Sequence, residues 1–223
     1  MSVILNAEKV SKTFSNQQLV LKPTSIKINR GEIYVIEGKS GSGKSTLLSI
    51  LGGLEKPTSG RVYYRNSSFY ELNDEKQSEI RGKSFGFIFQ SFHLIPELSV
   101  KQNIELPLTF NTVDNRLETK DLAKRLEIEY LLDKETTKLS GGEQQRVAIA
   151  RSLITLPDIV FADEPTGNLD HKTTRKIVNL LSELSNIYGI SLVIVTHEKK
   201  LIKEPHHLFE IQDGELRVKN RDV

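Results

Sequence analysis

The chain alternates between short apolar runs and longer segments in which apolar residues recur at helical spacing. Four runs rich in β-branched and aromatic residues predict strands, at residues 33–36, 85–89, 159–162 and 192–195. Each run is almost continuously apolar, which is typical of strands buried on both faces of a parallel sheet. The pattern therefore predicts an α/β fold in which helices cover a mainly parallel sheet.

Two other kinds of segment surround these runs. Residues 91–157 carry helical periodicity and are interpreted as a helical insert. Residues 3–9 with 18–28, and residues 209–218 folding back at Asp213-Gly214, indicate antiparallel side sheets. No internal repeat, low-complexity linker or long heptad run is found, so residues 1–223 are expected to form a single domain.

Polar residues follow each of the four predicted strands directly. Because ligands bind at the carboxyl ends of strands in open α/β sheets, these four ends should converge on one site. The residues at the ends are Glu37 with a glycine-rich loop, Gln90, Asp163 with Glu164, and Thr196 with His197.

Composition restricts the possible functions only in part. The 31 basic and 29 acidic residues give a net charge of +2, which offers no support for a nucleic-acid partner. The absence of cysteine excludes disulfides, thiolate metal sites and cysteine nucleophiles, and suits a reducing compartment. Residues 1–9 lack the apolar core of a secretory signal, and runs such as 190–195 are far shorter than a membrane span. Any membrane role is therefore expected to depend on a partner.

A phosphate-binding loop is the most specific motif in the chain. Residues 38–45 read GKSGSGKS between a predicted strand and a predicted helix, as this motif requires. Its backbone N–H groups would surround the phosphates, Lys44 would contact the β and γ phosphates, and Ser45 would ligate Mg²⁺. An ordinary glycine turn is the alternative. The candidate ATP-binding residues here are Gly38, Lys39, Ser40, Gly41, Ser42, Gly43, Lys44, Ser45 and Thr46.

Two adjacent carboxylates end the strand predicted at residues 159–162. Asp163 occupies the position at which phosphate-loop enzymes hold Mg²⁺ through water. Glu164 would lie within reach of the γ-phosphate, where a base can orient and deprotonate the attacking water. The alternative is a pair of solvated acids at a strand end. Together with the loop, the pair indicates ATP hydrolysis.

Residues 139–146, LSGGEQQR, predict a second anion site at a helix N-terminus. Ser140 followed by Glu143 is a capping box, and the exposed N–H groups of such a terminus attract anions. The capping and ligand-binding interpretations are compatible. One nucleotide held by two separate phosphate cradles would imply two copies of the chain facing each other head to tail.

The segment 139–146 resembles the signature motif of the ATP-binding cassette (ABC) family. The resemblance covers essentially the whole chain, because the other family motifs follow in order: residues 38–45, Gln90, the signature, Asp163-Glu164, residues 168–170 and His197. It implies a P-loop NTPase (RecA-like) core and a homodimer that sandwiches two ATP molecules. In such a dimer Ser140, Gly141, Gly142 and Asp170 would act on the partner's nucleotide.

The resemblance also implies roles for three further residues. Gln90 would contact the metal and the attacking water, and His197 would hydrogen-bond the γ-phosphate. Phe14 matches the aromatic residue that stacks on adenine. The alternative for His197 is a satisfied core histidine, and for Phe14 a core aromatic of a strand. The implied catalytic set is Lys44, Gln90, Glu164 and His197, with Ser45, Gln90 and Asp163 at the metal.

Residues 85–98 and 163–170 are similar to the ABC branch that serves lipoprotein release, export of macrolides and antimicrobial peptides, and cell division. The likeness implies an ATPase bound to an integral membrane permease at the cytoplasmic face of the membrane. Residues 92–98 would meet that permease, or else pack within the helical insert. Lys39 and Thr136 replace prolines that are common in the family, and neither change affects the phosphate contacts by a side chain.

Three rival functions are weighed against a transport ATPase. A cell-division ATPase would regulate its membrane partner instead of moving a substrate. A soluble cassette acting on DNA or the ribosome usually has long coiled coils or tandem cassettes, and this chain has one copy of each motif. A module that senses ATP without hydrolysing it is disfavoured because Glu164 and His197 are both present.

Overall fold

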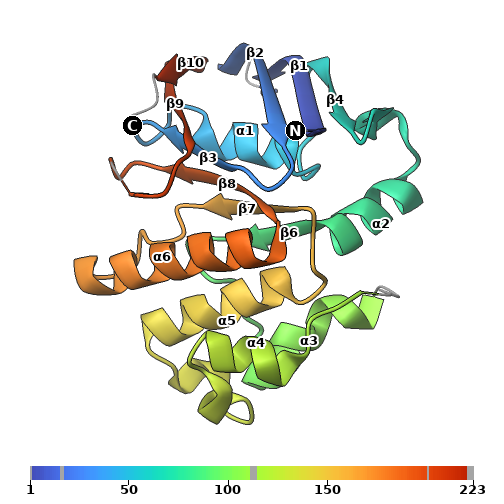
Figure 1. Ribbon diagram of the computed structural model, residues 1–223. Coiled ribbons are helices and arrows are strands. Elements are labelled where there is room, and N and C mark those ends of the chain that lie inside the picture. The colour runs from blue at the N-terminus through green and yellow to red at the C-terminus, as the bar shows by residue number, and fades with distance from the viewer. Residues whose placement is uncertain (1, 16–17, 111–114, 200, 220–223) are drawn as a thin grey trace.

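The computed structural model describes residues 2–15, 18–110, 115–199 and 201–219, and its strands form two sheets (Figure 1). The larger sheet has the order β10-β9-β3-β8-β7-β6, and the smaller, antiparallel sheet has the order β2-β1-β4-β5. The strands of the larger sheet are β3 (Ile33–Glu37), β6 (Phe85–Ile88), β7 (Ile159–Asp163), β8 (Ser191–Thr196), β9 (His207–Gln212) and β10 (Glu215–Lys219). Those of the smaller sheet are β1 (Val3–Thr13), β2 (Leu19–Asn29), β4 (Ser59–Tyr64) and β5 (Ser67–Ser68).

The four predicted core strands are confirmed as parallel neighbours. β3 pairs with β8, β8 with β7, and β7 with β6, all in parallel register. Successive residues of each strand face opposite sides of the sheet, as the pleat requires. In β7, for example, Ile159 and Phe161 belong to one buried cluster, whereas Val160 and Ala162 belong to the other. The sheet is therefore buried on both faces, and the predicted α/β fold with a P-loop NTPase core is confirmed.

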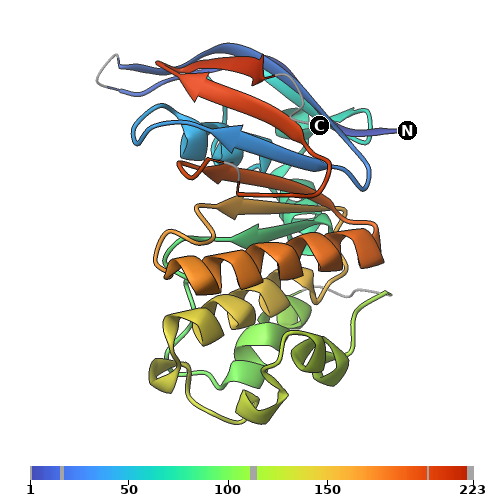
Figure 2. The ribbon, with the colours of Figure 1, turned by 60° about the vertical axis from the view of Figure 1, so that its left-hand side comes forward.

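Different elements cover the two faces (Figures 1 and 2). One face packs against α1 (Lys44–Leu51) and the antiparallel sheet. The other packs against α6 (His171–Tyr188) and against α3 (Val100–Phe110), α4 (Thr119–Arg125) and α5 (Gly141–Leu153), which lie between β6 and β7 in the sequence. Short 3₁₀ turns occur at Phe69–Glu71, Glu129–Leu131 and Thr136–Lys138. The single domain with an insert at 91–157 stays a prediction, and residues 111–114 of that insert lie outside the described residues.

The antiparallel hairpin predicted at residues 209–218 is confirmed, but its predicted place in the fold was wrong. The sequence pattern assigned residues 209–218 to a side sheet, but β9 runs parallel to β3 and extends the main sheet, while β10 pairs antiparallel with β9. The reason is that β8 occupies only one edge of β3. The hairpin occupies the other edge and pairs its backbone groups. By contrast, β1 and β2 do form the predicted antiparallel pair.

Helix α2 (Asp74–Ser84) was not predicted. Asn73 caps it by accepting a hydrogen bond from the backbone N of Lys76, at 3.0 Å. None of its side chains is buried, so the sequence carries no apolar stripe that would reveal it. In the described part of the chain, no helix combines the length and apolar character needed to cross a membrane.

Helix α5 lies directly on β6, and Gly86 makes this close approach possible. A Cβ at Gly86 would overlap the backbone oxygen of Ser152 in α5 and would lie 3.1 Å from Cγ2 of Val160. Since neither a backbone oxygen nor the neighbouring strand can move freely, any side chain here must separate the helix from the sheet.

We predict that Gly86→Ala lowers the free energy of unfolding by about 1–3 kcal/mol, because the added methyl overpacks the contact between β6 and α5. Denaturant titration of the purified protein measures the change, and Gly86→Ser should cost more. A Gly86→Ala protein within about 0.5 kcal/mol of the parent would contradict this account of the packing.

Candidate nucleotide-binding site

The carboxyl ends of the central strands meet at one cleft. The cleft has a volume of 550 Å³. It is lined by the loop between β3 and α1, by Gln90 after β6, by Glu164 after β7 and by His197 after β8. From that loop and the start of α1 the lining residues are Lys39, Ser40, Gly41, Gly43, Lys44, Ser45 and Thr46. The convergence of strand ends predicted from the sequence is therefore present.

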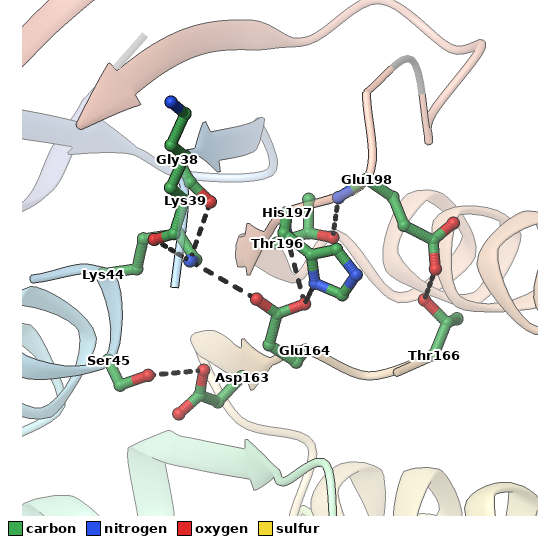
Figure 3. A network of polar contacts seen from close by, with 10 residues as sticks. All are labelled: Gly38, Lys39, Lys44, Ser45, Asp163, Glu164, Thr166, Thr196, His197 and Glu198. Atoms are coloured by element: carbon green, nitrogen blue, oxygen red, sulfur yellow. Dashed lines mark hydrogen bonds and ion pairs between the residues drawn. The ribbon is translucent and has the colours of Figure 1, made fainter. Parts of the chain in front are cut away.

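The loop is wrapped around the side chain of Lys44, which is 5% exposed. Its ammonium donates to the backbone oxygens of Gly38 and Lys39, at 2.9 and 3.0 Å, and lies 3.4 Å from Oε1 of Glu164 (Figure 3). The positive charge is thus fixed at the centre of the loop, with a carboxylate on its open side. This is the arrangement in which a lysine and backbone N–H groups receive phosphate oxygens.

The back of the loop is held by segments far away in the sequence. A Cβ at Gly43, where φ is +105°, would lie 2.8 Å from the backbone oxygen of Val20. A Cβ at Gly38 would lie 2.5 Å from the backbone oxygen of Ile211 in β9. The backbone N of Gly214 donates to the oxygen of Ser42 at 3.2 Å. Two loop glycines are therefore required by packing as well as by phosphate access. The hydroxyl of Ser42 itself is buried and has no hydrogen-bond partner among the residues that the structure describes.

Asp163 and Ser45 form the polar pair from which a metal site could be built. The Ser45 hydroxyl donates to Oδ1 of Asp163 at 2.9 Å. Burial raises the pKa of the Asp163 carboxyl above its usual range, the nearby Glu164 adds to the rise, and the Ser45 hydrogen bond opposes it. The described residues hold no group of three or more histidine, cysteine or acidic side chains that could bind a metal. A cation here would thus need further ligands from phosphate and water.

Glu164 lies between Lys44 and His197. Its backbone φ is +46°, a region that side chains other than glycine rarely adopt, and its N–H donates to the oxygen of Val195 at 2.9 Å. Oε2 lies 2.7 Å from Nδ1 of His197 and accepts from that residue's backbone N at 3.3 Å. The carboxylate is therefore held in one orientation at the edge of the cleft. His197 is 56% exposed, so it is not the core histidine that the alternative interpretation requires.

Gln90 lines the cleft and also contacts the segment after β7. A Cβ at Gly167 would lie 2.8 Å from Nε2 of Gln90, and Asn168 donates to the backbone oxygen of Gln90 at 2.9 Å. Phe14 is not among the cleft-lining residues: it is 42% exposed, with Lys12 lying 5.2 Å from its ring centroid. That exposure does not match a core aromatic.

The signature residues lie outside this cleft. Ser140 caps α5 and forms a complete capping box with Glu143, and Gly141 and Gly142 form the first turn of that helix. Asp170 caps α6: its carboxylate accepts from the backbone N of Lys172 and Thr173 and from the Thr173 hydroxyl. The Thr173 hydrogen bonds hold the pKa of Asp170 below its usual range. Within one chain the phosphate loop and the signature are thus on separate parts of the surface.

Sequence reasoning missed the residues that support the site from behind. Val20, Ile211 and Gly214 belong to β2 and the terminal hairpin, and they touch the loop only because of long-range packing. Asn103, fully buried in α3, was missed as well, although it exchanges hydrogen bonds with both backbone groups of Ile95. The one available signal was a polar residue at the helical spacing of the apolar positions, three residues after Val100.

Comparison with known proteins identifies the family. The model of the family described as ABC transporter matches residues 21–167. The lipoprotein-releasing system ATP-binding protein LolD of Francisella tularensis subsp. holarctica is 41% identical over 97% of this chain and 96% of its own length. The ABC transporter ATP-binding protein YtrE of Bacillus subtilis is 40% identical over 91% of this chain and 89% of its own.

Solved structures lead to the same family. The dimeric bacterial ABC transporter cassette MJ0796 has a TM-score of 0.86 and 38% identity, covering 98% of both chains. A second structure of MJ0796, a post-hydrolysis state bound to ADP and Pi, has a TM-score of 0.85. The chain therefore belongs to the ABC transporter family, as an ATP-binding subunit with ATPase activity.

Proposed function

We propose that this chain hydrolyses Mg·ATP as a head-to-tail homodimer and thereby drives a separate integral membrane permease of the lipoprotein-releasing kind, from the cytoplasmic face of the membrane. The observation that carries the proposal is the position of Glu164. Its carboxylate lies 3.4 Å from the Lys44 ammonium and 2.7 Å from the His197 ring, beside the phosphate loop. A base, a phosphate-binding cation and a hydrogen-bonding ring thus share one cleft.

In this proposal each cleft residue has a defined task in the conversion of ATP and water to ADP and phosphate. Lys44 and the loop N–H groups bind the β and γ phosphates, and Phe14 stacks on the adenine. Glu164 orients the attacking water and accepts its proton. Gln90, which follows β6, would contact the metal and the attacking water.

His197 positions Glu164 as well as the phosphate. A carboxylate only accepts hydrogen bonds, so Nδ1 of His197 must carry the proton that points at Glu164. With the ring neutral, Nε2 is then an acceptor. Donation from Nε2 to a phosphate oxygen therefore requires the imidazolium form, or rotation of the ring away from Glu164.

The donor set fits Mg²⁺. One hydroxyl and one carboxylate, Ser45 and Asp163, lie 2.9 Å apart, and Mg²⁺ typically takes one or two protein oxygens together with substrate phosphates and water. When bound, the cation would neutralise the charge on the β and γ phosphate oxygens. Its charge would also favour the ionised form of Asp163, which burial disfavours.

Dimerisation is proposed because one chain cannot bring its signature to its own cleft. Ser140 and Gly142 lie at the N-terminus of α5, on the helical side of the molecule, with backbone N–H groups suited to an anion. A second copy, turned head to tail, would bring these groups to the γ-phosphate. That the similar MJ0796 cassette is dimeric supports this proposal. Asp170, at the N-terminus of α6, would lie at the same interface.

A permease contact is proposed at residues 92–98. Two side chains fix this segment: Arg151 donates to the backbone oxygens of Phe92 and His93, at 2.7 and 2.6 Å, and Asn103 holds Ile95. Leu94 packs on the core, but Ile95 is 37% exposed. Beside the segment lies a groove of 350 Å³ whose lining includes Phe89, His93 and Pro107. A cytoplasmic helix of the permease would fit here.

We predict that Glu164→Gln lowers the ATPase rate by at least about 100-fold, because the amide cannot accept the proton of the attacking water. A steady-state phosphate-release assay measures the rate. Glu198→Gln is the matched control, since Glu198 contacts Thr166 at 3.3 Å and does not line the cleft. Equal rates in parent and Glu164→Gln would remove Glu164 as the base.

The same Glu164→Gln protein tests the proposed head-to-tail dimer. With hydrolysis blocked, saturating Mg·ATP should convert it from monomer to dimer, and ADP should not, because only ATP retains the γ-phosphate that joins the loop to the partner's signature. Light scattering coupled to gel filtration reports the mass. A protein that remains monomeric under these conditions would exclude the head-to-tail dimer.

We predict that Asp163→Asn raises the Mg²⁺ concentration needed for half-maximal ATPase activity at least tenfold, since a neutral amide replaces the anionic ligand. A magnesium titration at fixed ATP measures this, with Glu198→Gln again as the control. An unchanged magnesium requirement would assign the metal to other residues.

We predict that Ile95→Glu reduces copurification with the permease at least tenfold, because it introduces a charge into an apolar contact. Leu54→Glu is the matched control: Leu54 is 49% exposed and lies in the turn after α1. ATP binding by the isolated variants shows whether they are folded. Equal permease recovery with both variants would move the contact away from residues 92–98.

The molecule handled by the permease is tested through the captured partner. A permease that extracts lipid-anchored proteins from vesicles when this chain and ATP are added would support lipoprotein release. A partner that regulates cell-wall or division enzymes would favour the cell-division alternative, and recovery of ribosomes or DNA would favour a soluble cassette. LolD and YtrE are 41% and 40% identical to this chain, so sequence identity alone does not determine which molecule the permease handles.

A further inference from the structure

An exposed tyrosine contacts the signature from a neighbouring element. Tyr130 lies in the 3₁₀ turn Glu129–Leu131 and is 68% exposed. Its hydroxyl donates to Oε1 of Glu143 at 3.1 Å, and the Lys134 ammonium lies 5.5 Å from its ring centroid. The side chain contributes little to the core, so its polar contact with Glu143 is the feature to explain.

Glu143 in turn binds both polar groups of Ser140. Oε2 accepts from the Ser140 backbone N at 2.8 Å and lies 2.7 Å from the Ser140 hydroxyl. Because an ionised carboxylate only accepts, the hydroxyl must direct its one proton at Glu143. The Ser140 hydrogen bond holds the pKa of Glu143 below its usual range, which keeps the carboxylate ionised.

The hydrogen bond from the Ser140 hydroxyl to Glu143 prevents that hydroxyl from donating to a phosphate. The Ser140 hydroxyl has a single proton, and while that proton points at Glu143 the oxygen can offer only lone pairs to an incoming phosphate oxygen. To bind a γ-phosphate by its hydroxyl, Ser140 must turn the proton away from Glu143. The carboxylate then loses one of its donors.

We propose that Tyr130 is a positioning residue that retains the Glu143 carboxylate when Ser140 releases it, so that the Ser140 hydroxyl can bind the γ-phosphate of the partner's nucleotide. The inference rests on the head-to-tail dimer of the proposed function. After the switch Glu143 keeps two donors, the Ser140 backbone N and the Tyr130 hydroxyl. Without Tyr130 it keeps one, and its hold on the Ser140 hydroxyl tightens.

The proposal assigns Tyr130 an effect on dimerisation and none on ATP binding by one chain. Tyr130 is on the signature side, and the residues that line the cleft do not include it. The phenylalanine variant removes one exposed oxygen atom and leaves the ring, so the fold should tolerate it. Its effect should also depend on Glu143, since Tyr130 acts only through that carboxylate.

The test is a double-mutant cycle in the Glu164→Gln background, in which ATP-dependent dimer dissociation constants are measured by analytical ultracentrifugation. Y130F should raise the constant roughly three- to tenfold when Glu143 is present. In an E143A background, where Ser140 is free of the carboxylate, Y130F should change it less than about twofold. The affinity of the isolated chain for ATP should not change. Y63F, which removes the same atom from β4 of the antiparallel sheet, is the control.

Three outcomes would overturn the proposal. A Y130F variant that dimerises as tightly as the Glu164→Gln protein with Tyr130 intact would show that the Tyr130 hydroxyl has no effect on dimerisation. Equal effects in the Glu143 and E143A backgrounds would show that Tyr130 acts by packing or through Lys134. A Glu164→Gln protein with Tyr130 intact that stays monomeric with ATP would remove both the head-to-tail dimer and the inference, which separates a failure of the proposed function from a failure of Tyr130 alone.

Discussion

The burial of the central strands on both faces is the constraint on which the rest of the structure depends. Because β3, β7 and β8 are enclosed between two apolar clusters, their polar ends are the first places where charged groups can reach solvent. Parallel pairing brings those ends to one edge of the sheet. The cleft is therefore a consequence of core packing. Asp163, Glu164 and His197 reach it from the strand ends, and the loop after β3 brings Lys44 to them.

Much of this arrangement could be predicted from the sequence because it depends on local patterns. Continuous apolar runs revealed the strands, and the motif at residues 38–45 revealed the loop. What the pattern could not reveal was long-range or carried no apolar signal. Helix α2 has no buried side chain, and the terminal hairpin joins β3 for reasons of edge pairing that its own residues do not encode. The contact from Gly214 to the phosphate loop also results from this long-range pairing of the hairpin with β3.

Some residues of the phosphate motif are also required by the packing behind the loop. Gly38 and Gly43 belong to the phosphate motif, yet β9 and β2 lie so close behind them that a side chain would collide with Ile211 or Val20. The glycines of the motif are thus required both for phosphate binding and for packing against β2 and β9. The sequence alone does not distinguish these two requirements. Glu164 is a comparable case. Its chemistry was predicted, whereas its left-handed backbone and its contacts with Lys44 and His197 come from the structure.

The two helix caps suggest how binding can be coupled to assembly. Ser140 and Asp170 each satisfy the N-terminus of their own helix, and each is also proposed to meet a partner chain. A cap that stabilises the separate chain must give up part of its hydrogen bonding to bind in trans, so the free energy of the dimer is the difference between two satisfied states. A donor that remains on the carboxylate, as Tyr130 does on Glu143, lowers the free-energy cost of giving up the cap hydrogen bond and so favours the dimer. Reversible closure of the dimer requires such a balance, because a subunit that cycles must separate as readily as it assembles.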